Sequence, residues 1–141
     1  MGPLLKVMKK SRAVSCAAAV CTMILLDACW LLGAGSGKVY TSMASSLGEI
    51  QQWSLPKLFL IGGGVYLLLA LGLCTFCLSE GDPSLSALRG ALLGLVIFGV
   101  FDLTNLTFFG QGYGMQLAAM DICWGVFLFG TSALVGSLMG S

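Results

Sequence analysis

The sequence predicts an all-α integral membrane protein, a four-helix bundle with both termini on the inner side of the membrane. Of its 141 residues, 57% are hydrophobic and only 9% are charged, which is typical of membrane proteins. Four apolar runs are each long enough to cross a hydrocarbon core of about 30 Å. The basic residues are distributed unevenly between the connections, and this distribution indicates the orientation.

Composition limits the function as well. The net charge is +1, so the chain lacks the clustered basic face that nucleic-acid binding requires, and we expect no nucleic-acid partner. The absence of histidine leaves haem or pigment ligation little support, so we expect no cofactor and no metal. All six cysteines lie in apolar runs, where a free cysteine behaves as a small apolar residue. They do not indicate a disulfide framework.

The first helix is expected at residues 13–34, directly after a basic N-terminal segment at residues 1–12. That segment carries Lys6, Lys9, Lys10 and Arg12. A cleaved signal peptide also begins with basic residues, but its apolar region has only about 7–15 residues. Because this apolar run is longer, we predict a retained membrane helix. Residues 13–141 are then one four-helix transmembrane domain.

A polar connection follows at residues 35–55. Tyr40 and Trp53 suit the headgroup boundary of a membrane, so the connection is either a short surface helix or an ordered loop. The second helix is expected at residues 56–78, beginning at a proline. Small residues let membrane helices approach closely, so Gly62, Gly63 and Gly64 predict a helix contact.

The third and fourth helices are expected at residues 85–109 and 115–138. The polar strings SEGDPS and GQGYG separate the second, third and fourth apolar runs. Gly90 and Gly94 have the spacing of a helix-packing contact. Four basic residues before the first helix, together with Arg89, place both termini and the turn at residues 79–86 on the inner side.

Three acids lie inside the predicted helices. With about 1.5 Å per residue, Asp27, Asp102 and Asp121 all lie roughly 20–24 Å from the inner edge of the membrane. An acid in a membrane helix costs about 2.5–3.5 kcal/mol on insertion scales and therefore normally faces a protein interior. The sequence thus predicts three carboxyls at one level.

Each acid has polar or aromatic neighbours in the sequence. Asp27 and Asp121 begin the same D-x-C-W pattern, which ends at Trp30 and Trp124. A buried indole N–H needs an acceptor, and a carboxyl can supply one. The third helix adds Asp102, Thr104 and Asn105. The polar cluster expected inside the membrane therefore comprises Asp27, Trp30, Asp102, Thr104, Asn105, Asp121 and Trp124. It either fixes the register of the helices or binds a proton or a cation, since three neighbouring acids cannot all ionise alone.

Cys74-x-x-Cys77 is a spacing found in redox and metal sites. On a membrane helix without histidine or a second cysteine pair, we interpret these two cysteines as packing residues.

Three strings together resemble a known family: Asp27-x-x-Trp30, RGALLGLVIFGVFDLTN at residues 89–105, and Asp121-x-x-Trp124-Gly125. They are similar to the signature of the predicted membrane proteins grouped as domain of unknown function 2177. The chain departs from that pattern at Phe98 and Phe101, where the family has tyrosine. The resemblance implies four membrane helices and supplies no established activity.

These observations favour a non-catalytic integral membrane protein, not an enzyme. The first hypothesis is a structural or accessory subunit of a larger membrane complex, for example a bioenergetic complex. The alternative is a small transporter or a proton or cation pathway that uses Asp27, Asp102 and Asp121, and the third option is a lipid-modifying enzyme. The expected partners are membrane lipids and other membrane-protein subunits. The membrane is expected to be a bacterial inner membrane, or an organellar inner or thylakoid membrane.

Overall fold

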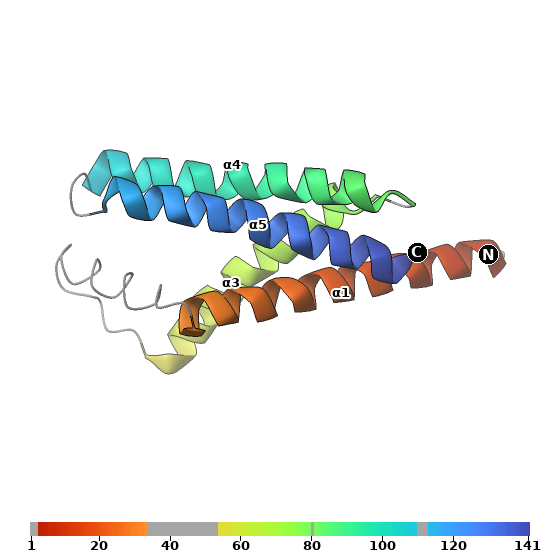
Figure 1. The fold of residues 1–141 in the computed structure, drawn as a ribbon. Helices are drawn as coiled ribbons and strands as arrows, with labels where there is room; N and C mark the ends of the chain where they lie inside the picture. Colours follow the sequence, from red (N-terminus) through yellow and green to blue (C-terminus); the bar gives the residue numbers. More distant parts are fainter. Residues whose placement is uncertain (1–2, 34–53, 80, 110–112) are drawn as a thin grey trace.

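The computed structural model describes residues 3–33, 54–79, 81–109 and 113–141, and the regular elements in these ranges are helices. Four helices are long and apolar enough to cross a membrane, which confirms the all-α fold class. The polar connection with Tyr40 and Trp53 lies outside the described residues. Figure 1 shows the helices running roughly along one direction.

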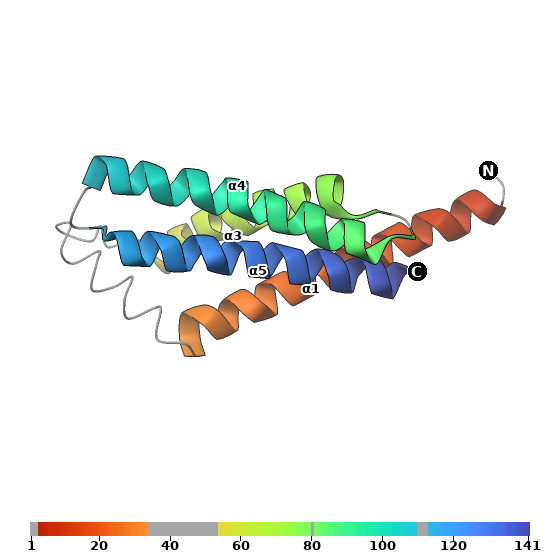
Figure 2. The same ribbon diagram turned by 45° about the horizontal axis from the view of Figure 1, so that its top comes forward.

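Helix α1 (Pro3–Gly33) begins ten residues before the predicted span. Its first turns contain leucine, lysine and methionine, which are good helix formers, and a proline in the first turn suits a helix start. Only Ser11–Gly33 is apolar enough to span the membrane. The basic segment therefore continues the helix, and its ribbon extends beyond the bundle (Figure 2).

Helix α3 (Leu55–Gly72) continues into a π-helical turn, η1 (Leu73–Cys77). Pro56 lies in the first turn of α3, as the sequence indicates. A π turn holds one more residue per hydrogen-bonded ring than an α turn. Leu73 and Cys77, at the two ends of η1, are both buried, and η1 is where this span packs against the other helices.

Helices α4 (Pro83–Phe109) and α5 (Met115–Gly140) form an antiparallel pair. The predicted turn before α4 contains Gly81 with φ of 77°, a backbone conformation that favours glycine. The side chain of Asp82 then caps α4, because its Oδ1 accepts a hydrogen bond of 2.9 Å from the backbone N–H of Leu85.

Glycines bring α4 and α5 into close contact. A Cβ added at Gly90 would lie 2.8 Å from Cβ of Ala133 and would overlap the backbone carbonyl of Phe129. A Cβ at Gly94 would overlap the backbone of Gly125. Both glycines that the sequence singled out on the third helix therefore lie where backbones approach closely.

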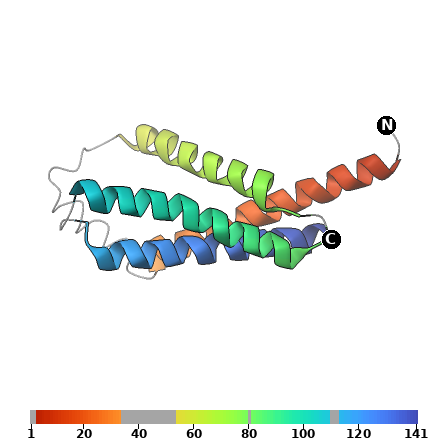
Figure 3. The ribbon, with the colours of Figure 1, turned by 90° about the horizontal axis from the view of Figure 1, so that it is seen from above.

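The described bundle provides no helix contact for Gly62, Gly63 and Gly64. A Cβ at any of them would meet no atom within 4 Å among the residues that the structure describes. The reason is the direction of α3, which lies away from its neighbours in its first half and approaches them toward η1 (Figure 3). The glycine triad therefore makes no packed contact within the described bundle.

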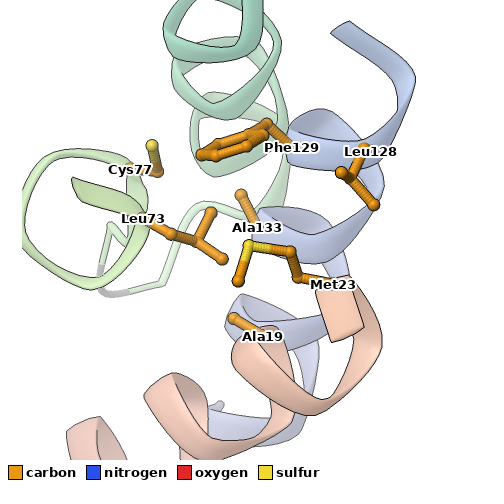
Figure 4. Close-up of a cluster of buried hydrophobic side chains, with 7 residues drawn as sticks. All are labelled: Ala19, Met23, Leu73, Cys77, Leu128, Phe129 and Ala133. Carbon is orange, nitrogen blue, oxygen red and sulfur yellow. The ribbon is translucent and has the colours of Figure 1, made fainter. Parts of the chain in front are cut away.

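Helix α5 lies between α4 and α1 (Figures 1 and 2). The core forms where α5 meets α1 and η1, as Figure 4 shows. Its fully or almost fully buried members are small or flexible side chains around one aromatic ring: Ala19, Met23, Leu73, Cys77, Leu128, Phe129 and Ala133. The alanines let the backbones approach closely, and the ring and the methionine fill the remaining space.

The two chain termini lie at the same end of the bundle (Figure 1). Ser11 on α1 donates a hydrogen bond from its hydroxyl to the backbone carbonyl of Gly140 at the end of α5. Termini at the same end of the bundle agree with an even number of membrane crossings. The assignment of this end to the inner side stays a prediction from the basic residues.

The outer surface of the bundle is apolar. Phe59 and Leu60 on α3 are 78% and 76% exposed, and large apolar side chains are exposed on the other helices too. Apolar surface of this extent is stable only in lipid or against another protein. The chain is therefore an integral membrane protein whose outer faces contact lipid.

Candidate functional site: two carboxyl centres inside the bundle

Asp27 joins three helices. Its Oδ1 accepts a hydrogen bond of 3.1 Å from Nε1 of Trp124 on α5. Its Oδ2 accepts a hydrogen bond from the hydroxyl of Tyr66 on α3. Both oxygens of this carboxyl are thus engaged by donors from other helices, which fixes the rotation of α1 relative to α3 and α5.

The two tryptophans of the D-x-C-W patterns stack on one another. The ring centroids of Trp30 and Trp124 are 4.5 Å apart, and the ring planes differ by 8°. The repeated pattern thus places an indole on each of two antiparallel helices at the same level. Trp124 donates to Asp27 of the other helix, so the indole and the acid pair between the helices.

Asp102 lies in a second centre, between α4 and the turn that precedes α5. The residue is 0% exposed. Its Oδ1 accepts a hydrogen bond from the hydroxyl of Tyr113, which is itself buried in that turn. Among the described residues, Oδ2 of Asp102 has no hydrogen-bond partner. A buried carboxyl oxygen without a donor is uncommon, because its desolvation is not offset.

Asp121 belongs to the second centre. It lies on α5, is 5% exposed, and is close enough to Asp102 and Tyr113 to act on both electrostatically. The phenol of Tyr113 lies outside the candidate spans. Burial raises its pKa, the hydrogen bond to Asp102 raises it further, and the charges of both acids act in the same direction. Tyr113 therefore stays a hydrogen-bond donor at neutral pH.

The structure thus divides the predicted cluster into two centres. Asp27, Trp30 and Trp124 form the first, and Asp102 and Asp121 form the second. Asn105 is half-buried and interacts with the hydroxyl of Tyr113, so it lies beside the second centre. Thr104 is different, because its side chain is exposed on the outside of α4. Thr104 was wrongly expected inside because it lies only two residues after Asp102. A helix turns about 100° per residue, so two residues apart the side chains point in nearly opposite directions.

Sequence reasoning missed two site residues, Tyr66 and Tyr113. Tyr113 lies in GQGYG, which was interpreted only as a turn, and Tyr66 is 39 residues from its partner Asp27. A phenol inside or next to an apolar run needs a polar partner when buried, and the acids were the available acceptors. That requirement is the signal that could have identified both tyrosines.

The phenylalanines at which the chain departs from the family pattern have different surroundings. Phe98 makes an edge-to-face contact with Phe129, with centroids 6.3 Å apart, and it covers Gly125. Phe101 is exposed on the outside of α4. Phe98 therefore packs in the interface between α4 and α5.

The cysteines are free thiols. Cys77 is buried in the core, and Cys74 contacts the thiol of Cys16 on α1. These positions agree with the interpretation of Cys74-x-x-Cys77 as packing residues. Within the described ranges, no group of three histidine, cysteine, aspartate or glutamate side chains is arranged to hold a metal ion.

Comparison with known proteins identifies a family. The family model described as "Predicted membrane protein (DUF2177)" matches residues 12–138, which is most of the chain. No curated protein and no solved structure matches the sequence. The matched range begins one residue after the start of the first candidate span and includes both carboxyl centres. The chain therefore belongs to the DUF2177 family of predicted membrane proteins.

Proposed function

We propose that this protein is a non-catalytic structural or accessory subunit of a larger membrane complex. The observation that supports the proposal is the weak attachment of α3. From Leu55 to Val65 almost every described residue of this helix is exposed, although the helix is as apolar as a membrane span. A helix that packs over only half its length leaves a long apolar surface available to another membrane protein.

The glycine triad on α3 supports the same proposal. Gly62, Gly63 and Gly64 have open space around them within the described bundle, and Phe59 and Leu60 precede them. Small residues beside large apolar ones suit close packing with a helix of a partner subunit. The Asp27 centre contributes by holding α3 to α1 through Tyr66, which keeps this surface in place.

The test is the native particle that contains the chain. The protein is extracted from its own membrane in mild detergent, and the particle is sized and identified by native mass spectrometry. We expect a particle much larger than 14.7 kDa with a fixed composition. A particle of monomer size with bound lipid only would contradict the proposal.

A matched pair of variants tests the role of α3. Gly63→Leu adds bulk to the glycine triad, and Ala119→Leu adds the same bulk to an exposed position on α5. We expect Gly63→Leu to release the chain from the particle and Ala119→Leu to leave the particle intact. Equal behaviour of the two variants would exclude α3 as the docking helix.

A second candidate function is a proton or cation pathway. It is favoured by the buried Oδ2 of Asp102, which lacks a hydrogen-bond partner in the described chain and lies near a second acid. The test is ion flux into vesicles that contain the purified protein, with Asp102→Asn as the variant. Absence of flux in the unmodified protein would eliminate this candidate and would leave the subunit proposal unaffected.

A further inference from the structure

Two arginines lie near the π-helical turn η1, at the end of the bundle that holds the termini. Arg12 is on α1 and Arg89 is on α4, and both helices begin at this end (Figure 1). Both arginines are exposed. Arg12 is close enough to Cys74, and Arg89 to Cys77, to act on the thiol electrostatically. Positive charges from two different helices therefore lie near η1.

Both arginines belong to candidate membrane spans. Arg12 is the second residue of the span Ser11–Gly33, and Arg89 is the seventh residue of the span Pro83–Phe109. A charged side chain in a span faces the protein interior or extends to the headgroup layer. Since both arginines are exposed, the second case applies. The Cα–Cβ bonds of a helix tilt toward its N-terminus, so α1 and α4 direct both side chains toward the same headgroup layer.

The acids of the chain do not neutralise this end of the bundle. Neither arginine forms an ion pair with a carboxylate in the part of the chain that the structure describes. The side chain of Asp82 caps α4. Five basic residues belong to this end: Lys6, Lys9, Lys10, Arg12 and Arg89. The connection before α4 supplies only two acids, Glu80 and Asp82, so an excess of positive charge is available to an anionic ligand.

The surroundings of the arginines indicate the class of that ligand. A guanidinium presents parallel N–H donors that match two oxygens of a phosphate group. Deeper in the membrane the surface is apolar, because Leu92 on α4 and Phe76 in η1 are exposed. Leu92 follows Arg89 by three residues, so the two lie on neighbouring faces of α4. A ligand with an anionic phosphate and apolar chains matches both features.

We propose that Arg12 and Arg89 bind the headgroups of anionic phospholipids around η1, with the acyl chains on the exposed apolar surface of η1 and α4. The basic segment of α1 adds to the attraction. Lys6 precedes the candidate span by five residues, so its backbone lies at most about 8 Å beyond the start of that span. This is about one Debye length at physiological salt, within which a membrane surface attracts basic residues.

This inference does not depend on the subunit proposal. The surface proposed for a partner subunit is the first half of α3, at the opposite end of the bundle (Figure 1). Lipid retention is measured on the chain alone, whereas complex membership is measured on the native particle. Either result can fail while the other holds.

Native mass spectrometry of the full chain in mild detergent measures the bound lipid directly. The chain is mixed with equal amounts of phosphatidylglycerol and phosphatidylcholine that have the same acyl chains, and the ratio of the two adducts is recorded. We expect the phosphatidylglycerol adduct to predominate. Arg12→Gln and Arg89→Gln should each lower the ratio about fivefold, the usual contribution of one basic residue near an anionic surface.

Two further variants separate a phosphate-binding site from general surface charge. Arg89→Lys keeps the charge but loses the paired donors, so its ratio should lie between those of the unmodified chain and Arg89→Gln. Lys57→Gln removes the same charge near the start of α3, at the opposite end of the bundle, and should leave the ratio unchanged. Tryptophan fluorescence checks that each variant is folded.

Four outcomes would overturn the proposal. Equal adducts of the two lipids would exclude a preference for anionic headgroups. An equal effect of Lys57→Gln and Arg89→Gln would exclude a site around η1. Complete displacement of the lipid by millimolar inorganic phosphate would show a site for free phosphate. A native particle without anionic lipid, in which a carbodiimide crosslinks the basic segment to carboxyls of another subunit, would show an acidic protein partner in place of the lipid.

Discussion

The contact between α4 and α5 gives the sharpest prediction about stability, and the variant is Gly90→Ala. The added methyl would lie 2.8 Å from Cβ of Ala133 and 2.9 Å from the carbonyl carbon of Phe129. Ordinary contacts of a Cβ begin at about 3.4 Å, so the helices would have to separate by roughly half an ångström or more. The atoms in the way belong to backbone or to a short side chain, and neither can rotate aside.

Forced packing of this kind costs about 1–3 kcal/mol of unfolding free energy. Gly63→Ala is the matched control, because the same change on α3 meets no described atom within 4 Å. The intrinsic preference of a helix for alanine is common to both variants and cancels in the comparison. We therefore expect Gly90→Ala to be less stable than Gly63→Ala by about 1–3 kcal/mol.

The assay is unfolding by sodium dodecyl sulfate from mild-detergent micelles, followed by tryptophan fluorescence. The stacked pair Trp30 and Trp124 provides the signal, since it connects α1 and α5 and separates when the bundle opens. Equal stability of the two variants within about 0.5 kcal/mol would refute the close contact at Gly90.

Three further predictions concern the polar groups, the orientation and the independence of distant contacts. Asp27→Ala leaves two half-buried donors without an acceptor and should cost about 1–3 kcal/mol in the same unfolding assay, with a red shift of the fluorescence. Ser84→Cys should react with a membrane-impermeant maleimide only from the inner side and Met115→Cys only from the outer side, and the reverse pattern would contradict the orientation. Gly90→Ala combined with Asp102→Asn should lower the unfolding free energy by the sum of the separate changes within about 0.3–0.5 kcal/mol, because the two positions lie twelve residues apart on α4. A larger discrepancy would indicate coupling along α4.

The membrane spans were predictable because hydropathy is a local property. The third and fourth helices were expected at residues 85–109 and 115–138, and the structure has Pro83–Phe109 and Met115–Gly140. The start of α1 was not predictable in this way. Hydropathy identifies where a chain enters lipid, and the lysine-rich turns before that point are helical without being apolar.

The partners of the acids were not predictable from the same pattern. A helix that is apolar on nearly every face does not indicate which face is turned inward. Such a sequence predicts how deep a residue lies in the membrane, but not how the helix is rotated about its own axis. The depths predicted from the sequence place Asp27, Asp102 and Asp121 at one level in the membrane. The rotation of each helix decides which partners an acid meets: Tyr66 and Trp124 for Asp27, and Tyr113 for Asp102. It depends on contacts between residues up to 97 positions apart along the chain.

Small residues and polar residues thus have different tasks at the two ends of the bundle. Toward the termini, Gly136 approaches Ala19 and the backbone of Ser15 closely, which sets the distance between α1 and α5. A contact between small residues limits distance but tolerates some rotation, whereas a hydrogen bond is directional. The polar groups of the Asp27 centre, toward the opposite end, therefore fix the rotation that the small residues leave free.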